Sequence, residues 1–377
     1  MTDGNAVPRA GNRWSVAIAG TLLQLCLGTV YAWSFFQKPL MSAYGWSNKE
    51  AALTFSLTIC CLGVAAAAGG INLGRFGPRK LAVAGALLFG LGYLIAAFAL
   101  SRHSLALLYL GYGVVGGTGL GLGYVTPIAT AVKWFPDRRG LVTGMVVMGF
   151  GFGALLMSKL LAPRLMDAAG GDLVRVFAWL GAGLGAVSLG AAAFLRNPPP
   201  GWRPEGWTPP PPPTGVAAGA EFCGSPLQCV LSGRFAMLWT MFFCNIAAGI
   251  AIIGFQSPLI QSLYARLDPA TDGRTLAAYG ATLIAVSSIF NGLGRFFWGG
   301  LSDRIGRAWT FRVMLGTQIL AFAALLFTGN PWVFGALVCY VLLCYGGGFG
   351  TMPSFIADVF GPKMMPYVYG TILTAWS

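Results

Sequence analysis

The sequence has few charged residues. Asp, Glu, Lys and Arg make up 9% of its 377 residues, whereas soluble domains carry about 25%. Hydrophobic residues account for 56% of the chain. So few charges cannot give a protein of this size a hydrated surface. This excludes a soluble enzyme, a nucleic-acid-binding protein and a disordered scaffold, and it indicates a polytopic membrane protein.

Carboxylates and histidine are scarcer still, with 11 Asp and Glu residues and a single histidine, His103. The eight cysteines show no spacing typical of a metal site or a disulfide framework, and we interpret them as small apolar residues. No nucleophile–base pair and no metal-ligand cluster appears. We therefore expect a protein that is not an enzyme and that binds no metal and no cofactor.

Long apolar runs are what the sequence has instead. A helix needs about 20 apolar residues to cross the hydrocarbon core. Ten runs satisfy this, at 14–36, 51–73, 81–100, 105–131, 141–161, 176–195, 235–257, 276–298, 311–328 and 332–355. An eleventh begins near Tyr367 and reaches Ser377. We expect an all-α membrane protein whose last bundle is incomplete, truncated in the eleventh span.

A proline-rich segment divides these runs into two sets. Residues 196–233 contain Pro198–Pro200 and a proline run at 209–213, a composition typical of an extended, solvated linker. We expect a cytoplasmic N-terminal segment at 1–13, a six-helix bundle at 14–195, a cytoplasmic linker at 196–233 and a second bundle at 234–377. At the start of the second run, Ser47 and Glu50 have the spacing of a capping box.

The basic residues predict the orientation. The net charge of +13 would suggest a nucleic-acid partner in a soluble chain. Here, fifteen of the 24 basic residues fall in segments on the side of the N-terminus and eight on the other side. Positively charged loops stay in the cytoplasm. We expect a multi-pass protein of the inner (cytoplasmic) membrane with a cytoplasmic N-terminus, no nucleic-acid partner and a monomeric state.

Two loops repeat one pattern in the two halves. Gly70 to Lys80 follows the second run, and Gly299 to Arg307 follows the eighth. The second copy resembles the G-x-L-x-D-R-x-G-R signature of the major facilitator superfamily, while the first has Gly74 in place of the Asp. Further segments resemble the oxalate:formate antiporter family, relatives of the monocarboxylate transporters: Gly11–Trp14, Tyr31–Ser34, Tyr44–Ser47, Lys133–Gly140 and Asn291–Arg295.

The resemblance implies a major facilitator fold, with two six-helix bundles around a central cavity that opens to each side in turn. It implies cavity-lining roles for Tyr31, Trp33, Tyr124, Tyr345 and Phe349, although most aromatic residues of a bundle fill the core or an interface belt. It also implies that the loop residues stabilise the outward-open state. We assign this gating role to Gly299, Asp303, Arg304, Arg307, Gly70 and Arg75. For Arg304 and Arg307, ordinary positive-inside topology is an alternative.

Arg295 is the main candidate for substrate binding. If Asp303 marks the cytoplasmic helix end, Arg295 lies about 12 Å deep at 1.5 Å per residue, near the middle of a core about 30 Å thick. A charge there normally faces a cavity or a partner, and no acidic residue lies in any apolar run. An anionic substrate held by the guanidinium fork is the simplest partner. The alternative is an arginine that snorkels to the interface.

Asn291 lies one turn from Arg295 on the same helix face. It could donate to the substrate carboxylate or orient the guanidinium. The alternative is an ordinary hydrogen bond between helices. Three glycine-rich stretches, 116–123, 149–153 and 346–350, also lie inside apolar runs, where they favour close helix packing or bending rather than a nucleotide site.

Trp376 departs from the pattern of the family. The resemblance places a second cationic residue, a lysine, at this position in oxalate-exchanging relatives, but Tyr369 to Trp376 ends on an indole. A site with one arginine neutralises one carboxylate, and the second carboxylate of oxalate would enter uncompensated. We therefore expect a secondary active transporter of monocarboxylates such as lactate, pyruvate, glycolate or formate.

The absence of acidic residues and histidine from the runs favours anion exchange, because proton relays use buried Asp, Glu or His. Proton-coupled symport and oxalate:formate exchange remain alternatives. So does a ligand-binding sensor or a fragment that does not transport.

Overall fold

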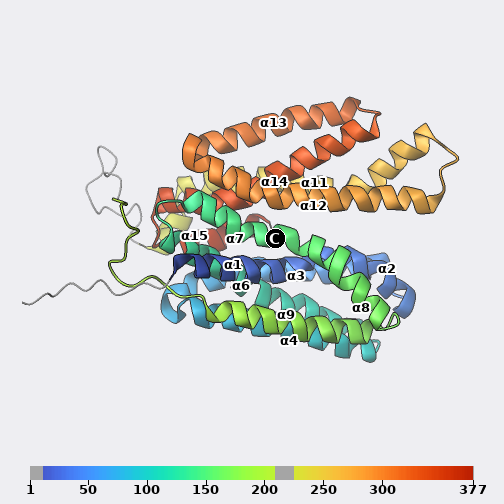
Figure 1. The fold of residues 1–377 in the computed structure, drawn as a ribbon, viewed down its shortest axis with the longest axis horizontal. Helices are drawn as coiled ribbons and strands as arrows, with labels where there is room; N and C mark the ends of the chain where they lie inside the picture. Colours follow the sequence, from blue (N-terminus) through green and yellow to red (C-terminus); the bar gives the residue numbers. More distant parts are fainter. Residues whose placement is uncertain (1–11, 209–224, 377) are drawn as a thin grey trace, which may run out of the picture.

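The computed structural model describes residues 12–208 and 225–376 (Figure 1). The N-terminal bundle is built from α1 (Arg13–Leu27), η1 (Gly28–Ala32), α2 (Trp33–Tyr44), α3 (Asn48–Phe76), α4 (Pro78–Ser101), α5 (Leu105–Leu108), η2 (Tyr109–Gly116), α6 (Gly117–Trp134), α7 (Arg139–Leu156), η3 (Met157–Leu161), α8 (Ala162–Ala168) and α9 (Leu173–Ala193). The C-terminal part consists of α10 (Pro226–Val230), α11 (Gly233–Leu267), α12 (Gly273–Ile305), α13 (Arg307–Phe327), α14 (Pro331–Phe360), α15 (Met365–Ile372) and η4 (Leu373–Ala375). The residues described contain helices and no strand, so the all-α prediction is confirmed.

The apolar runs form helices of membrane-spanning length. Nine helical segments in the described ranges are long and apolar enough to cross a bilayer. The run at 276–298 lies within α12, whose 33 residues are also long enough to span. The proline run at 209–213 and residues 1–11 lie outside the described residues.

Three of the predicted spanning helices contain a segment that is not α-helical. The first passes through the 3₁₀ segment η1, and the fourth and fifth contain the π-helical segments η2 and η3. Glycines occur in η1 and η2, and glycine lacks the side chain that stabilises a regular α-helix. Gly28 of η1 has a second reason to be glycine, because a Cβ there would collide with the carbonyl oxygen of Phe150.

Local sequence signals determine where helices begin and end. The capping box at the start of α3 is confirmed, since the Ser47 hydroxyl accepts from the Glu50 amide and the Glu50 carboxylate accepts from the Ser47 amide at 2.7 Å. Three long helices end at glycines with positive φ, namely Gly77 after α3, Gly306 after α12 and Gly361 after α14. A glycine with positive φ therefore ends the helix at equivalent places in the two halves, after α3 and after α12.

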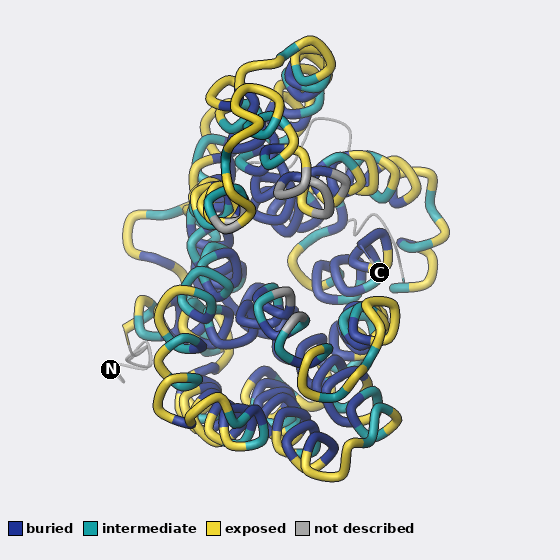
Figure 2. Tube along the Cα trace, turned by 90° about the vertical axis from the view of Figure 1, so that its right-hand side faces the viewer, coloured by how far each residue is buried: buried dark blue, intermediate teal, exposed yellow. Residues whose placement is uncertain are grey.

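The two halves pack on each other through a few helices. Figure 1 shows α1 to α9 in the lower half and α11 to α14 in the upper half, with the linker leaving at one end, which we call the linker end. Across the halves, α7 packs on α12 and α14, and α3 packs on α15. Helices α2 and α8 lie at the opposite end (Figure 1). There α2 packs mainly on α3 and η1, and α8 packs mainly on η3 and α9, all of which belong to the same half. Figure 2 shows buried residues facing inward and exposed residues around the rim.

Candidate functional site

Arg295 lies in α12 at the boundary between the halves and is fully buried, with no exposed surface. Glycines of two neighbouring helices allow this placement. A Cβ at Gly144 of α7 or at Gly350 of α14 would collide with the carbonyl oxygen of Arg295. The three helix backbones therefore meet closely at this residue, which holds the base of its side chain in place.

The Arg295 guanidinium has few polar contacts. Its Nε donates to Asn291 Oδ1 at 3.4 Å and its Nη1 donates to the Val147 carbonyl at 3.3 Å. Its Nη2 has no hydrogen-bond partner in the described part of the chain, and no carboxylate there forms an ion pair with it. A buried charge with an open donor is costly unless a partner arrives. The geometry leaves Nη2 available to an acceptor, and the contact with Asn291 holds the guanidinium in place.

Aromatic rings surround the guanidinium. Its Cζ lies 4.8 Å from the Phe349 ring centre and 5.5 Å from that of Phe150, within the range of cation–π attraction. The Trp376 ring lies 5.0 Å from Phe349 and 5.9 Å from Tyr31. We call the surrounding set the aromatic box. It consists of Tyr31, Tyr124, Phe150, Tyr345, Phe349, Tyr369 and Trp376.

The four tyrosines of the aromatic box all lie close enough to Arg295 for its charge to be felt at the phenol oxygen. The phenol oxygens of Tyr31, Tyr124 and Tyr369 are buried and make no well-aligned hydrogen bond within the described ranges, although Tyr31 interacts with Tyr345 and Tyr124 interacts with Tyr369 and Arg295. A buried phenol normally finds a well-aligned hydrogen-bond partner. Weakly bonded phenols beside the open guanidinium donor form an arrangement suited to a small anion.

The structure brings together all the residues that we predicted to bind substrate. Arg295, Asn291, Tyr31, Tyr124, Tyr345 and Trp376 lie in or against the aromatic box, as does Phe349. Trp33 does not, and that expectation is wrong. Its Nε1 donates to the Ala51 carbonyl at 2.9 Å and its ring packs on Tyr112 at 4.6 Å, so it fills the core of the N-terminal bundle.

Sequence reasoning missed Phe150 and Tyr369. Phe150 contacts Arg295, Tyr31 and Tyr124, but we had interpreted its glycine-rich stretch as a site of close helix packing or bending. A bulky ring between glycines on a spanning helix was the available signal. Tyr369 stands in the same motif as Trp376, and its ring lies 6.4 Å from that of Tyr124.

Asp303 connects the two halves at the linker end. Its Oδ1 accepts from the Gly140 amide at 3.0 Å and its Oδ2 from the Leu141 amide at 2.9 Å. These amides lie in the first turn of α7, whose N-cap residue Arg138 makes no side-chain cap. Asp303 therefore caps α7 from the other half. Its negative charge also interacts favourably with the positive end of the α7 helix dipole.

Ion pairs extend this contact. Arg307 binds Asp303 at 2.6 Å and Asp358 at 3.0 Å, and Arg139 of α7 binds Asp358 at 3.0 Å. Gly299 lies where α12 crosses α7, and a Cβ there would lie 2.6 Å from the Gly140 carbonyl oxygen. We had not predicted a role for Asp358 or Arg139. The network places Asp303, Arg307 and Gly299 at the contact between the halves.

The remaining gating candidates differ. Gly70 of α3 faces the Pro366 carbonyl of α15, where a Cβ would collide, so it matches Gly299 in the other half. Arg304 is exposed, and Arg75 is exposed beside the Phe76 ring at 5.4 Å. Within the described residues neither arginine joins an ion pair. The part of the chain that the structure describes therefore shows no ion pair between the halves at these two arginines.

Comparison with known families agrees with the fold. Residues 13–377 match the family described as Major Facilitator Superfamily. In solved structures, the fold is similar to that of the proton:xylose symporter XylE, with a TM-score of 0.66 at 15% identity over 97% of this chain and 86% of that one. It is also similar to FucP in its outward conformation, with a TM-score of 0.60 at 14% identity over 96% and 99%.

Three curated relatives cover most of the chain. The oxalate:formate antiporter of Oxalobacter formigenes is 26% identical over 97% of this chain and 82% of its own. The apicoplast pyruvate carrier 1 of Toxoplasma gondii is 30% identical over 81% and 63%. Monocarboxylate transporter 11 of Mus musculus is 28% identical over 94% and 74%.

Proposed function

The chain belongs to the Major Facilitator Superfamily, and from that premise we propose that it moves small carboxylate anions across the membrane by alternating access. As a member it is a multi-pass membrane transporter. We propose lactate, pyruvate, glycolate and formate as the preferred class of substrate. The chain would lie in the inner (cytoplasmic) membrane as a monomer, with its N-terminus and linker end in the cytoplasm.

One observation carries this proposal: Arg295 is completely buried, has an open Nη2 donor and has no carboxylate partner among the described residues. A substrate carboxylate would accept from the guanidinium and from the phenols of the aromatic box. Three relatives with carboxylates or monocarboxylates in their names support the same class.

The aromatic box supports a substrate with one carboxylate. The positive charge within the aromatic box is that of Arg295. Trp376 belongs to the box and occupies the position at which a lysine would add a second positive charge. A second carboxylate would be buried without compensation, which costs several kcal/mol. A short apolar tail, by contrast, would pack against the rings of Phe150 and Phe349.

The mode that we propose is exchange of one anion for another. The acidic residues of the described ranges lie in loops or near helix ends, and His103 lies in a turn against Tyr44. A proton relay within the membrane needs a buried Asp, Glu or His. In exchange, the two halves would rock around Arg295 only when an anion is bound there. Arg295 lies where α7, α12 and α14 meet.

The packing between the halves supports a state that is closed at the linker end and in which Arg295 is occluded. Asp303 contacts Gly140, and Gly70 contacts Pro366. Both contacts lie at the linker end. With the linker end in the cytoplasm, these contacts close the cytoplasmic side.

Counterflow in proteoliposomes tests the proposal. Vesicles containing the purified chain are loaded with unlabelled lactate, formate, oxalate or buffer and are then offered labelled lactate. We expect transient accumulation with lactate and formate inside, and none with oxalate or buffer. Accumulation driven by oxalate would contradict the one-carboxylate site. Accumulation in buffer-loaded vesicles that requires an inward proton gradient would favour proton symport, and binding without any flux would favour a sensor.

A further inference from the structure

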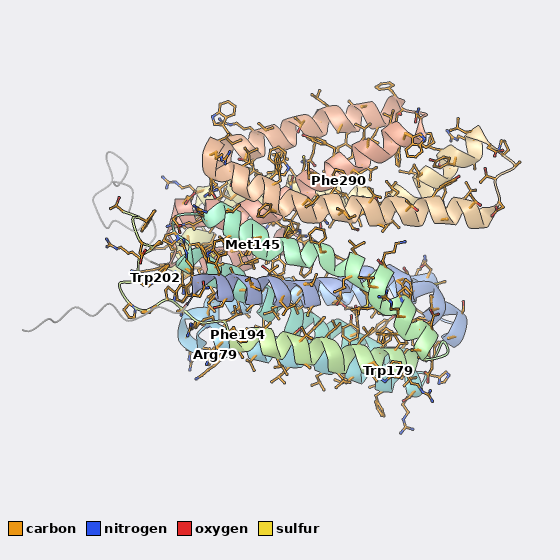
Figure 3. The ribbon with its side chains drawn as sticks, in the orientation of Figure 1. Arg79, Met145, Trp179, Phe194, Trp202 and Phe290 are labelled. Carbon is orange, nitrogen blue, oxygen red and sulfur yellow. The ribbon has the colours of Figure 1, made fainter. Side chains whose placement is uncertain are left out.

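A pocket lies at the linker end of the N-terminal bundle, away from the aromatic box. It is formed where α1 and α4 begin and α9 ends, and it is lined by Ser15, Arg79, Ala193, Phe194 and Arg196. Figure 3 shows Arg79 and Phe194 at the same end of this half. We call it the arginine pocket. Nothing in the transport cycle proposed above uses it.

The arginine pocket carries uncompensated positive charge. Arg79 and Arg196 are exposed and belong to none of the ion pairs found in residues 12–208 and 225–376. The neighbouring Arg13 already holds Asp137 at 2.7 Å. The N-cap of α4, Gly77, makes no side-chain cap and Pro78 has no N–H, so the amides of Arg79 and Lys80 add the positive end of a 24-residue helix.

An apolar surface continues from the arginine pocket toward the middle of the membrane. Phe194 is 61% exposed and Leu87 is 53% exposed. Leu87 follows Arg79 by eight residues on the same face of α4, and Val187, which is also exposed, precedes Phe194 by seven on the same face of α9. Between them on α9, a Cβ at Gly190 would meet nothing within 4 Å, so the surface there is open.

We propose that the arginine pocket binds the headgroup of an anionic phospholipid in the leaflet at the linker end. The phosphate would accept from Arg79 and Arg196, and an acyl chain would lie along the exposed faces of α4 and α9. A basic pocket between spanning helices at the cytoplasmic surface suits such a lipid. A soluble anion would use the arginines but would leave the apolar surface without an occupant, which is why we assign a lipid.

Native mass spectrometry of the purified chain tests this site. The protein is titrated with phosphatidylglycerol or with phosphatidylcholine, and the bound lipids are counted. We expect at least one phosphatidylglycerol to bind more tightly than phosphatidylcholine. In the double variant Arg79→Ala/Arg196→Ala, this affinity should fall roughly 30-fold, since each basic residue contributes about 1 kcal/mol at such a surface. The variant Arg79→Lys/Arg196→Lys keeps both charges and should retain most of the binding.

The matched control is Arg102→Ala/Arg164→Ala, which removes two exposed arginines from the opposite end of the same half. It should leave the tight phosphatidylglycerol site unchanged. The proposal is overturned if this control loses the site as the test variant does, or if the test variant keeps it. It is also overturned if inorganic phosphate at millimolar concentration displaces the lipid, because the pocket would then bind a free anion. Transport is not the readout, so failure here is separate from failure of the proposed function.

Discussion

At the scale of single residues, the proposed site depends on one guanidinium. Arg295 combines complete burial with an open donor, and the rings of Phe150 and Phe349 stabilise its charge without neutralising it. Aromatic faces can hold a cation in a dry environment and still leave its N–H groups free for a substrate. An arginine presents two parallel donors to a carboxylate, which a lysine does not.

Replacing Arg295 by lysine therefore tests the fork itself. We expect Arg295→Lys to lower counterflow of lactate at least tenfold, because losing one charged hydrogen bond costs about 1.5–3 kcal/mol. The amount of folded protein, measured by size-exclusion chromatography, should be unchanged. Arg312→Lys, at an exposed arginine beside Trp309 on α13, is the matched control and should transport normally. Normal flux in Arg295→Lys would remove this residue from the site.

We propose that Trp376 limits the aromatic box to a substrate with one carboxylate. We expect Trp376→Lys to raise the oxalate-to-lactate ratio of counterflow about tenfold, since the new ammonium would pair with a second carboxylate. Trp332→Lys, at a tryptophan that is 80% exposed on α14, makes the same chemical change away from the box and should leave the ratio as it is. An unchanged ratio in Trp376→Lys would show that Trp376 does not set the charge of the site.

At the scale of helices, glycines determine how closely the two halves approach. Gly140 in the first turn of α7 faces Gly299 of α12, and a Cβ at Gly140 would lie 2.7 Å from Asp303 Oδ1 and 2.6 Å from Arg307 Nη1. The amide of the same residue donates to Asp303. One position thus serves both the packing and the capping of the contact at the linker end.

We expect Gly140→Ala to lower counterflow at least tenfold, because the halves could no longer close on each other at the linker end. Gly183→Ala on α9 is the control, since a Cβ there meets nothing within 4 Å, and it should stay within twofold of the wild type. Both variants are compared at equal protein in the same vesicles. Wild-type flux in Gly140→Ala would show that this close approach is not needed for transport.

The sequence predicted helices better than it predicted their irregularities. The apolar runs located the spanning helices, because a chain that crosses a membrane must form long helices of low polarity. The capping box at Ser47 marked where one of them begins. The break at η1 lies where Gly28 packs against Phe150, a residue far away in the chain. Such long-range contacts leave no periodic signal.

The same reasoning applies to the site. Arg295 was recognisable because a charge in an apolar run is exceptional, whereas Phe150 was one of many aromatics in such runs. Trp33 was misplaced for the same reason, since a resemblance in sequence does not say which face of a helix a ring occupies. Asp358 was visible as a charge, but its pairing with Arg139 and Arg307 needed the fold.

At the scale of the whole molecule, the two halves make unequal contacts at the linker end. On one side Asp303 caps α7 across the boundary. On the other side the equivalent position is Gly74, and the N-cap of α15, Met364, makes no side-chain cap. Alternating access needs two states of similar free energy, so a weaker contact on one side favours opening.

Adding a carboxylate at Gly74 would test this balance. A Cβ there would meet only the Tyr367 hydroxyl, at 3.8 Å, so an aspartate fits and its carboxylate would face the first turn of α15. We expect Gly74→Asp to favour the state closed at the linker end by about two- to fivefold, because a charge at a helix N-terminus contributes about 0.3–1 kcal/mol. The effect should be smaller than that of Asp303, since Pro366 in this turn has no N–H to donate.

Distances between spin labels at the linker end measure the shift. Labels at Lys80→Cys and Arg312→Cys, in a cysteine-free background, lie on exposed positions of opposite halves. Gly74→Asp should increase the population with the shorter distance and slow counterflow, because leaving the closed state would cost more. Gly74→Ala adds the Cβ without the charge and should match the wild type. If the aspartate variant also matches the wild type, capping at this second contact does not control the balance between the two states.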